Sequence, residues 1–162
     1  MVKYQIGGSL AANVATYVER AADTQLSQAL LQRSFCYVLT SRQMGKSSLR
    51  VQMRHQLEAA GKGRCAVIDM TRIGSQQITQ EQWYQGLAFD IARQLRSPQQ
   101  FNIPLWWHSL GDLSPAQKLS PFIETVLRAD EAQEPLFIFL DEIDRVRSLS
   151  FSMGDFFSFV RF

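Results

Sequence analysis

The alternation of apolar runs with amphipathic segments along the chain predicts an α/β fold. Three short runs at residues 35–39, 65–69 and 136–140 are mostly apolar and rich in aromatic and β-branched residues. This composition is typical of buried parallel strands. Between and around these runs, apolar residues recur at helical spacing. The order strand, helix, strand, helix, helix, strand predicts a three-layer fold with a parallel sheet.

The expected helices occupy residues 16–33, 48–60, a segment opened by Thr79, a segment opened by Ser114, and the last residues from about Asp155. Their apolar stripes are Leu26, Ala29 and Leu30; Leu49, Met53, Leu57 and Ala60; Trp83, Leu87, Ile91 and Leu95; and Leu119, Phe122, Ile123, Val126 and Leu127. Thr79 and Ser114 each precede a Gln at the third following position, which is a capping-box pattern. Residues 97–113 contain two prolines and a glycine and are expected to be irregular.

Residues 40–48 predict a phosphate-binding loop between the first strand and its helix. The context matches the Gly-x-x-x-x-Gly-Lys-Ser/Thr motif, with Thr40 in place of its first glycine. Gly45 would let the backbone approach phosphates, Lys46 would contact the β- and γ-phosphates, and the Ser47 hydroxyl would ligate Mg²⁺. The candidate nucleotide-binding residues here are Arg42, Gln43, Met44, Gly45, Lys46, Ser47 and Ser48.

A second motif follows the run at 136–140, which ends in Asp141-Glu142. A buried strand ending in an acidic pair is the Walker B pattern. Asp141 is therefore expected to hold Mg²⁺ and Glu142 to activate the attacking water. Asp144 fits a helix N-cap as well as a site residue. Asp69, at the end of the run at 65–69, is expected to cap the following turn rather than to enter the site.

With these motifs in view, the chain resembles the AAA-like ATPase domain of cyanobacterial multidomain proteins, which belongs with the STAND signal-transduction ATPases. The matching stretches are Gly7-Gly8-Ser9-Leu10, Tyr17-Val18-x-Arg20-x-Ala22-Asp23, residues 35–50, Glu81-Gln82-Trp83-Tyr84 and residues 155–161. The resemblance implies that Val18 and Arg20 contact the adenine. It also implies fused effector or sensor domains, and it is compatible with a nucleotide-dependent oligomer.

The resemblance also implies a sheet in which the second strand pairs with the third, while a fourth strand separates the third from the first. Residues 1–162 are then the N-terminal portion of an AAA-like P-loop ATPase domain, incomplete at its C-terminal side. The strands at 35–39 and 136–140 are expected to be parallel but not hydrogen-bonded neighbours. Sensor and arginine-finger groups would lie beyond Phe162. Arg145 and Arg147 are candidate cationic groups near the site, but we expect them to be solvated.

Composition narrows the function classes. Hydrophobic residues make up 46% of the chain and charged residues 20%, which suits one globular domain. The formal net charge of +2 does not indicate nucleic acid. We expect a cytoplasmic protein without a membrane span or signal peptide. Cys36 and Cys65 lie in expected strands and are interpreted as reduced thiols.

The resulting hypothesis is a nucleotide switch that binds ATP or ADP with Mg²⁺ and hydrolyses ATP weakly or not at all as this chain. One alternative is a non-catalytic nucleotide-binding or assembly fragment. Another is a small-molecule kinase or GTPase on the same scaffold. The Asp141-Glu142 pair suits water activation better than a kinase reaction, and no Asn-Lys-x-Asp sequence for guanine recognition occurs.

Overall fold

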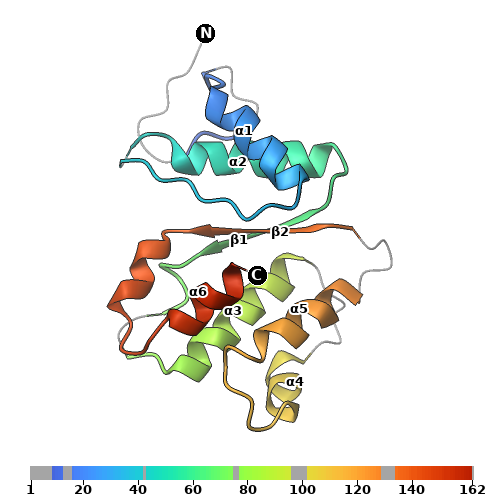
Figure 1. Ribbon diagram of the computed structural model, residues 1–162, viewed down its shortest axis with the longest axis vertical. Helices are drawn as coiled ribbons and strands as arrows, with labels where there is room; N and C mark the ends of the chain where they lie inside the picture. The colour runs from blue at the N-terminus through green and yellow to red at the C-terminus, as the bar shows by residue number, and fades with distance from the viewer. Residues whose placement is uncertain are drawn as a thin grey trace. The chain divides into compact units, whose positions relative to one another are not determined.

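A computed structural model describes residues 9–12, 16–41, 43–74, 77–95, 102–128 and 134–161 (Figure 1). The chain divides into two compact units, residues 1–64 and residues 65–162. Each unit is described by itself below.

The first unit contains two helices that pack against each other, α1 (Ala21–Leu31) and α2 (Lys46–Ala59). In α2 the side chains of Leu49, Met53 and Leu57 are buried, as the stripe predicts. Ala60 is exposed, because the helix ends before it. Helix α1 begins at Ala21 rather than at residue 16, because Arg20 at its N-cap has extended backbone angles and residues 16–19 are not helical.

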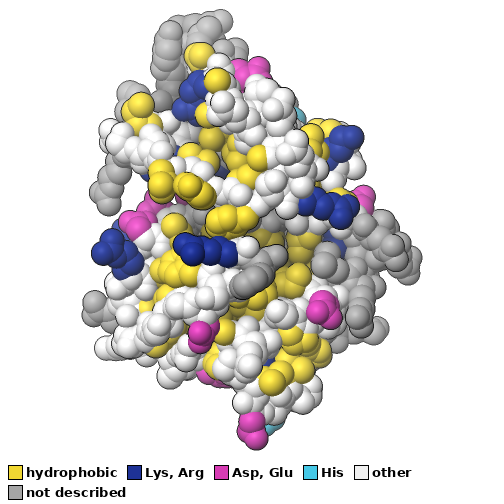
Figure 2. Space-filling model, in the orientation of Figure 1, with side chains coloured by type: hydrophobic (Ala, Val, Ile, Leu, Met, Phe, Trp, Pro, Cys, Tyr) yellow, Lys and Arg dark blue, Asp and Glu magenta, His cyan; other side chains and the backbone are white. Residues whose placement is uncertain are grey.

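The predicted strand at residues 35–39 is wrong for this structure, which has no strand there. Phe35, Tyr37 and Leu39 are 54%, 74% and 85% exposed. Hydrophobic side chains accordingly reach the visible surface of this unit (Figure 2). A strand requires a hydrogen-bonded neighbour, and an apolar sequence indicates only the propensity to join one. Cys36 is half-buried rather than buried, and burial raises the pKa of its thiol.

The second unit is built on a sheet of two strands, β1 (Arg64–Asp69) and β2 (Leu136–Asp141). The two arrows run in the same direction in Figure 1, so the pair is parallel. At its carboxyl end the Met70 amide donates to the Asp141 carbonyl over 3.1 Å. Both strands were predicted at these places, and their pairing agrees with the expected adjacency of second and third strands.

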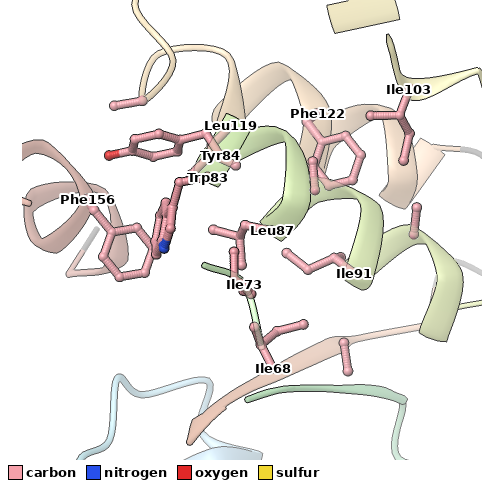
Figure 3. Packing of buried hydrophobic residues seen from close by; sticks show 14 of the residues in the cluster. Ile68, Ile73, Trp83, Tyr84, Leu87, Ile91, Ile103, Leu119, Phe122 and Phe156 are labelled. Atoms are coloured by element: carbon pink, nitrogen blue, oxygen red, sulfur yellow. The ribbon is translucent and has the colours of Figure 1, made fainter. Parts of the chain in front are cut away.

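The core of this unit lies around α3 (Gln80–Gln94), which packs against α4 (Ile103–Ser109) and α5 (Leu119–Arg128). Together with α6 (Gly154–Val160), α3 and α5 lie on the same side of the sheet in Figure 1. The predicted stripe on α3 is confirmed, because its four members are at most 4% exposed. Figure 3 shows Trp83 and Phe156 packed together, with ring centroids 5.2 Å apart in an edge-to-face arrangement.

Residues 103–109 were expected to be irregular but form α4. The Asn102 side chain accepts a hydrogen bond from the Leu105 amide over 3.0 Å, and Pro104 lies in the first turn, where its missing N–H costs nothing. Trp107 is fully buried, and its indole N–H donates to Glu81 Oε1 over 2.6 Å. The Trp107 side chain therefore belongs to the core.

The structure therefore confirms an α/β protein with a small parallel sheet and several helices. The full three-layer arrangement remains a prediction.

Candidate functional site: the phosphate loop and the acidic strand end

The predicted phosphate loop leads directly into α2. Gln43 has φ 63° and Gly45 has φ 81°, and Gly45 is the N-cap of the helix. The Leu49 amide donates to the Gly45 carbonyl over 2.9 Å, which is the first helical bond. The amides of Lys46, Ser47 and Ser48 therefore lie in the first turn, where N–H groups precede any intrahelical acceptor and attract anions.

The Lys46 ammonium contacts the beginning of the same loop. Its Nζ donates to the Thr40 carbonyl over 2.7 Å and lies 3.4 Å from the Ser41 carbonyl. Both carbonyls are neutral acceptors, so a phosphate oxygen would compete well for this ammonium.

Arg20 lies against the other end of the loop. Its NH1 group donates to the Met44 carbonyl over 2.8 Å. A Cβ placed on Gly45 would lie 3.4 Å from the same NH1. Arg20 was expected to contact adenine, and the structure places it beside the backbone of the predicted phosphate loop.

Asp23 holds Arg20 in that place. Asp23 is 1% exposed, and its Oδ2 accepts from the Arg20 amide over 3.0 Å and lies 3.5 Å from Arg20 Nε. The Tyr17 hydroxyl donates to Asp23 Oδ1. Hydrogen bonding to Tyr17 raises the pKa of Arg20, and the nearby carboxylate adds to this rise. Burial, followed by the contact with Asp23, raises the pKa of Tyr17.

Residues Leu10 and Ala11 near the N-terminus are hydrogen-bonded to α2. The Leu10 amide donates to the hydroxyl of Ser48 over 3.0 Å, and Gln52 Nε2 donates to the Ala11 carbonyl over 3.2 Å. Ser48 and Gln52 are both buried. Ser48, expected in the nucleotide site, thus has a structural contact through its hydroxyl.

In the second unit, Asp141 ends β2 and Glu142 follows it with a left-handed φ of 54°. The Glu142 amide donates to Asp141 Oδ1 over 3.1 Å. Glu142 is exposed, whereas Asp141 is half-buried. Asp69 Oδ1 accepts from the Thr71 amide and hydroxyl over 2.9 and 2.6 Å, which confirms its expected role as a turn cap.

The short 3₁₀ helix η1 (Ile143–Ser148) begins after Glu142. Asp144 lies inside it and is exposed, so it is not the N-cap. Arg145 and Arg147 are exposed, as expected.

Val18 and Arg42 are the remaining candidate nucleotide-binding residues. Val18 is 75% exposed, while Arg42 lies outside the described residues. Sequence reasoning assigned no role to Tyr17, Asp23 or Gln52. The three-residue spacing of Arg20 and Asp23 at a helix start was a signal for their pairing.

Within the described part of the chain, no group of three or more His, Cys, Asp or Glu side chains is arranged to hold a metal ion. Over the same residues, no helix combines the length and apolar character needed to cross a membrane.

Comparison with known proteins gives two matches. The model of the AAA-like domain family matches residues 5–162. An uncharacterized WD repeat-containing protein of Synechocystis sp. is 44% identical over 159 residues, which is 98% of this chain and 13% of that protein. The chain thus spans a small part of its relative's length. No solved structure matches. Because the family model covers nearly the whole chain, this protein belongs to the AAA-like domain family.

Proposed function

We propose that this chain binds ATP or ADP with Mg²⁺ through residues 43–48. The observation that carries the proposal is the loop geometry, in which Gly45 in a left-handed conformation starts α2 and leads into Lys46 and Ser47. Membership of the AAA-like family supports it. Gln43, Met44, Gly45 and the following first-turn amides would bind phosphate oxygens, and Arg42 remains a candidate by its place in the motif.

Lys46 would supply a positive charge to the β- and γ-phosphates. Its present acceptors, the Thr40 and Ser41 carbonyls, lie in the same loop. We therefore propose that nucleotide binding exchanges or shares these contacts, while the rest of the loop keeps its conformation.

Ser47 and Asp141 are the proposed Mg²⁺ ligands. A hydroxyl and a carboxylate suit this ion, because Mg²⁺ prefers hard oxygen ligands and usually keeps several waters. When bound, Mg²⁺ would neutralise charge on the β- and γ-phosphates. Asp141 is held near the strand end by the bond from the Glu142 amide, and Glu142 is proposed to orient water.

We propose that hydrolysis by this chain is weak. Glu142 is exposed, so water hydrates and screens its carboxylate. Electrostatic catalysis is strongest in a site from which water is excluded. Binding is therefore proposed as the principal activity of the chain by itself.

The biological setting proposed is a STAND-type switch, in which residues 1–162 form part of a nucleotide-binding domain. Fused sensor or effector domains are supported by the relative, a WD repeat-containing protein of which this chain covers 13%. Nucleotide would shift the balance between domain arrangements only if it binds one arrangement more tightly.

The test is Lys46→Ala, measured by calorimetry with Mg²⁺-ATP and Mg²⁺-ADP. Loss of a charge-assisted phosphate contact should cost ~1.5–3 kcal/mol, a roughly 10- to 150-fold loss of affinity. Lys62→Ala is the matched control, because Lys62 is an exposed lysine of the same unit beyond the end of α2. Equal affinities for wild type and Lys46→Ala would refute the assignment.

A further inference from the structure

We propose that Asp23 and Arg20 are positioning residues that keep the Met44–Gly45 peptide in the orientation required for phosphate binding. The inference rests on the proposed nucleotide site and deepens it. It assigns Arg20 a role on the phosphate loop in place of the contact with adenine.

The carboxylate of Asp23 has a fixed position. Its carboxylate is 1% exposed, and a buried carboxylate is held in place by the groups that pair with it. It accepts from the Arg20 amide, receives the Tyr17 hydroxyl and lies 3.5 Å from Arg20 Nε. Asp23 thus fixes both the backbone and the guanidinium of Arg20.

The contact with Asp23 sets the direction of the Arg20 guanidinium. With Nε at Asp23, its NH1 group reaches the Met44 carbonyl over 2.8 Å. The guanidinium is planar and holds its donors in a rigid fork, so one anchored edge determines where the other donors point. Asp23 therefore acts on the phosphate loop through Arg20.

The geometry of the Met44–Gly45 peptide links the Met44 carbonyl to the Gly45 N–H. The described chain has no cis peptide bonds, so the Met44 carbonyl and the Gly45 N–H point in opposite directions. With the carbonyl held toward Arg20, the Gly45 N–H faces away from the cation. A flip of this peptide would turn a carbonyl to that side, where it would repel phosphate.

Gly45 makes such control necessary. Glycine adopts positive and negative φ with similar ease, so its backbone alone does not select the observed 81°. The contact from Arg20 to the Met44 carbonyl selects one orientation.

The experiment compares Mg²⁺-ATP with inorganic tripolyphosphate, which has phosphates but no base. Affinities are measured for wild type, Arg20→Met, Asp23→Asn and the double variant, with tripolyphosphate measured by competition against ATP. Glu19→Gln is the matched control, because it removes an exposed carboxylate beside Arg20. The melting temperature of each unliganded variant reports whether it is folded.

Arg20→Met and Asp23→Asn should each lower the affinities for ATP and for tripolyphosphate by the same factor. We expect roughly 3- to 10-fold, as for loss of one ordinary hydrogen bond. The double variant should bind no more weakly than Arg20→Met, because Asp23 acts through Arg20. Glu19→Gln should change neither affinity.

A loss confined to ATP would assign Arg20 to the base and overturn the proposal. Additive losses of affinity in the double variant would show that Asp23 does not act on the loop through Arg20. An unchanged tripolyphosphate affinity in folded Asp23→Asn would show the same. If Asp23→Asn does not fold, Arg20→Met still decides, since that side chain is 41% exposed. Failure of the nucleotide site itself appears separately, as equal affinities for wild type and Lys46→Ala.

Discussion

At the scale of single residues, Gly45 combines a positive φ with a close neighbour. Gly45→Ala should lower the free energy of unfolding by ~1–2 kcal/mol, because a Cβ is unfavourable in the left-handed region. It should also weaken nucleotide binding, since the added Cβ lies 3.4 Å from Arg20 NH1. Denaturant unfolding and calorimetry measure the two effects.

Gly61→Ala is the control for this prediction. Gly61 has φ 58°, and a Cβ there would meet nothing within 4 Å. It should lower stability similarly without changing nucleotide affinity. A comparable loss of affinity in both variants would show that backbone strain alone, rather than the place in the loop, weakens binding.

Tyr84 is a second residue with a measurable consequence. It is fully buried, and its hydroxyl has no hydrogen-bond partner among the described residues. Burial, with a smaller effect of Asp155, raises the pKa of Tyr84 to about 12 from 10.0. The folded protein therefore keeps a proton that the unfolded chain releases between these values. This contribution to stability is complete below pH 10 and is lost as the pH rises toward 12.

Tyr84→Phe should reduce the loss of stability between about pH 10 and 12 by ~2–3 kcal/mol, from the two-unit shift. At pH 7 it should be neutral or stabilising by ~1 kcal/mol, because an unpaired hydroxyl is removed from the core. Unfolding by urea across pH measures both effects. Tyr37→Phe removes a hydroxyl from an exposed tyrosine and is the control for the stability change at pH 7. An identical alkaline loss in Tyr84→Phe would contradict the assignment.

At the scale of elements, one carboxylate links three segments of the second unit. Glu81 in α3 accepts from Trp107 in α4 and lies 3.3 Å from Lys118, just before α5. The Lys118 side chain is 7% exposed and that of Glu81 is 42% exposed. The cation therefore depends more strongly on the pair than the carboxylate does.

Glu81→Ala should lower the free energy of unfolding by ~1–3 kcal/mol, discounted for exposure, because it leaves a buried cation and an indole N–H unpaired. Lys118→Met should cost less, since an apolar side chain of similar length replaces the cation. The control Glu58→Ala breaks the exposed pair with Arg54 and should cost no more than ~0.5 kcal/mol. Urea unfolding that ranks Lys118→Met above Glu81→Ala would contradict this order.

The elements that sequence predicted well are those whose signal is local. The stripe on α3 and its capping box at Thr79 and Gln82 depend on residues three or four positions apart, and both are present. Helix α4 was missed because the two prolines and the glycine of residues 97–113 suggested a loop, although Asn102 and Pro104 are good helix-start residues. The segment at 35–39 was misjudged because strand pairing depends on distant partners.

In the candidate nucleotide site, too, the sequence predicted local features but not long-range contacts. The loop motif predicted the positions of Gly45 and Lys46 at the start of α2, since it carries its own local geometry. The pairing of Arg20 with Met44 spans 24 positions and could not be read from spacing. Asp23 lies inside the helix expected at residues 16–33, and its spacing from Arg20 was a signal for their pairing, but its burial and its contact with Tyr17 come only from the structure.

At the scale of the whole molecule, the proposed function requires the two motifs to serve one nucleotide. The family match covers both, from residue 5 to residue 162. The Mg²⁺ proposal takes one oxygen ligand from each motif, Ser47 and Asp141. Metal dependence of nucleotide affinity is therefore the property that tests their cooperation.

Asp141→Asn should bind Mg²⁺-free ATP like the wild type but lose most of the gain in affinity that Mg²⁺ provides, because the amide lacks the carboxylate's charge. Residues that only hydrogen-bond to metal ligands typically contribute 10- to 100-fold in metal affinity, so loss of a proposed ligand itself should cost roughly tenfold or more. Titrations of ATP with Mg²⁺ and with a chelator measure this difference. Asp144→Asn is the control, because Asp144 is an exposed carboxylate three residues away within η1. If both variants keep the wild-type response to Mg²⁺, the end of β2 takes no part in metal binding. The chain would then bind nucleotide through its loop alone.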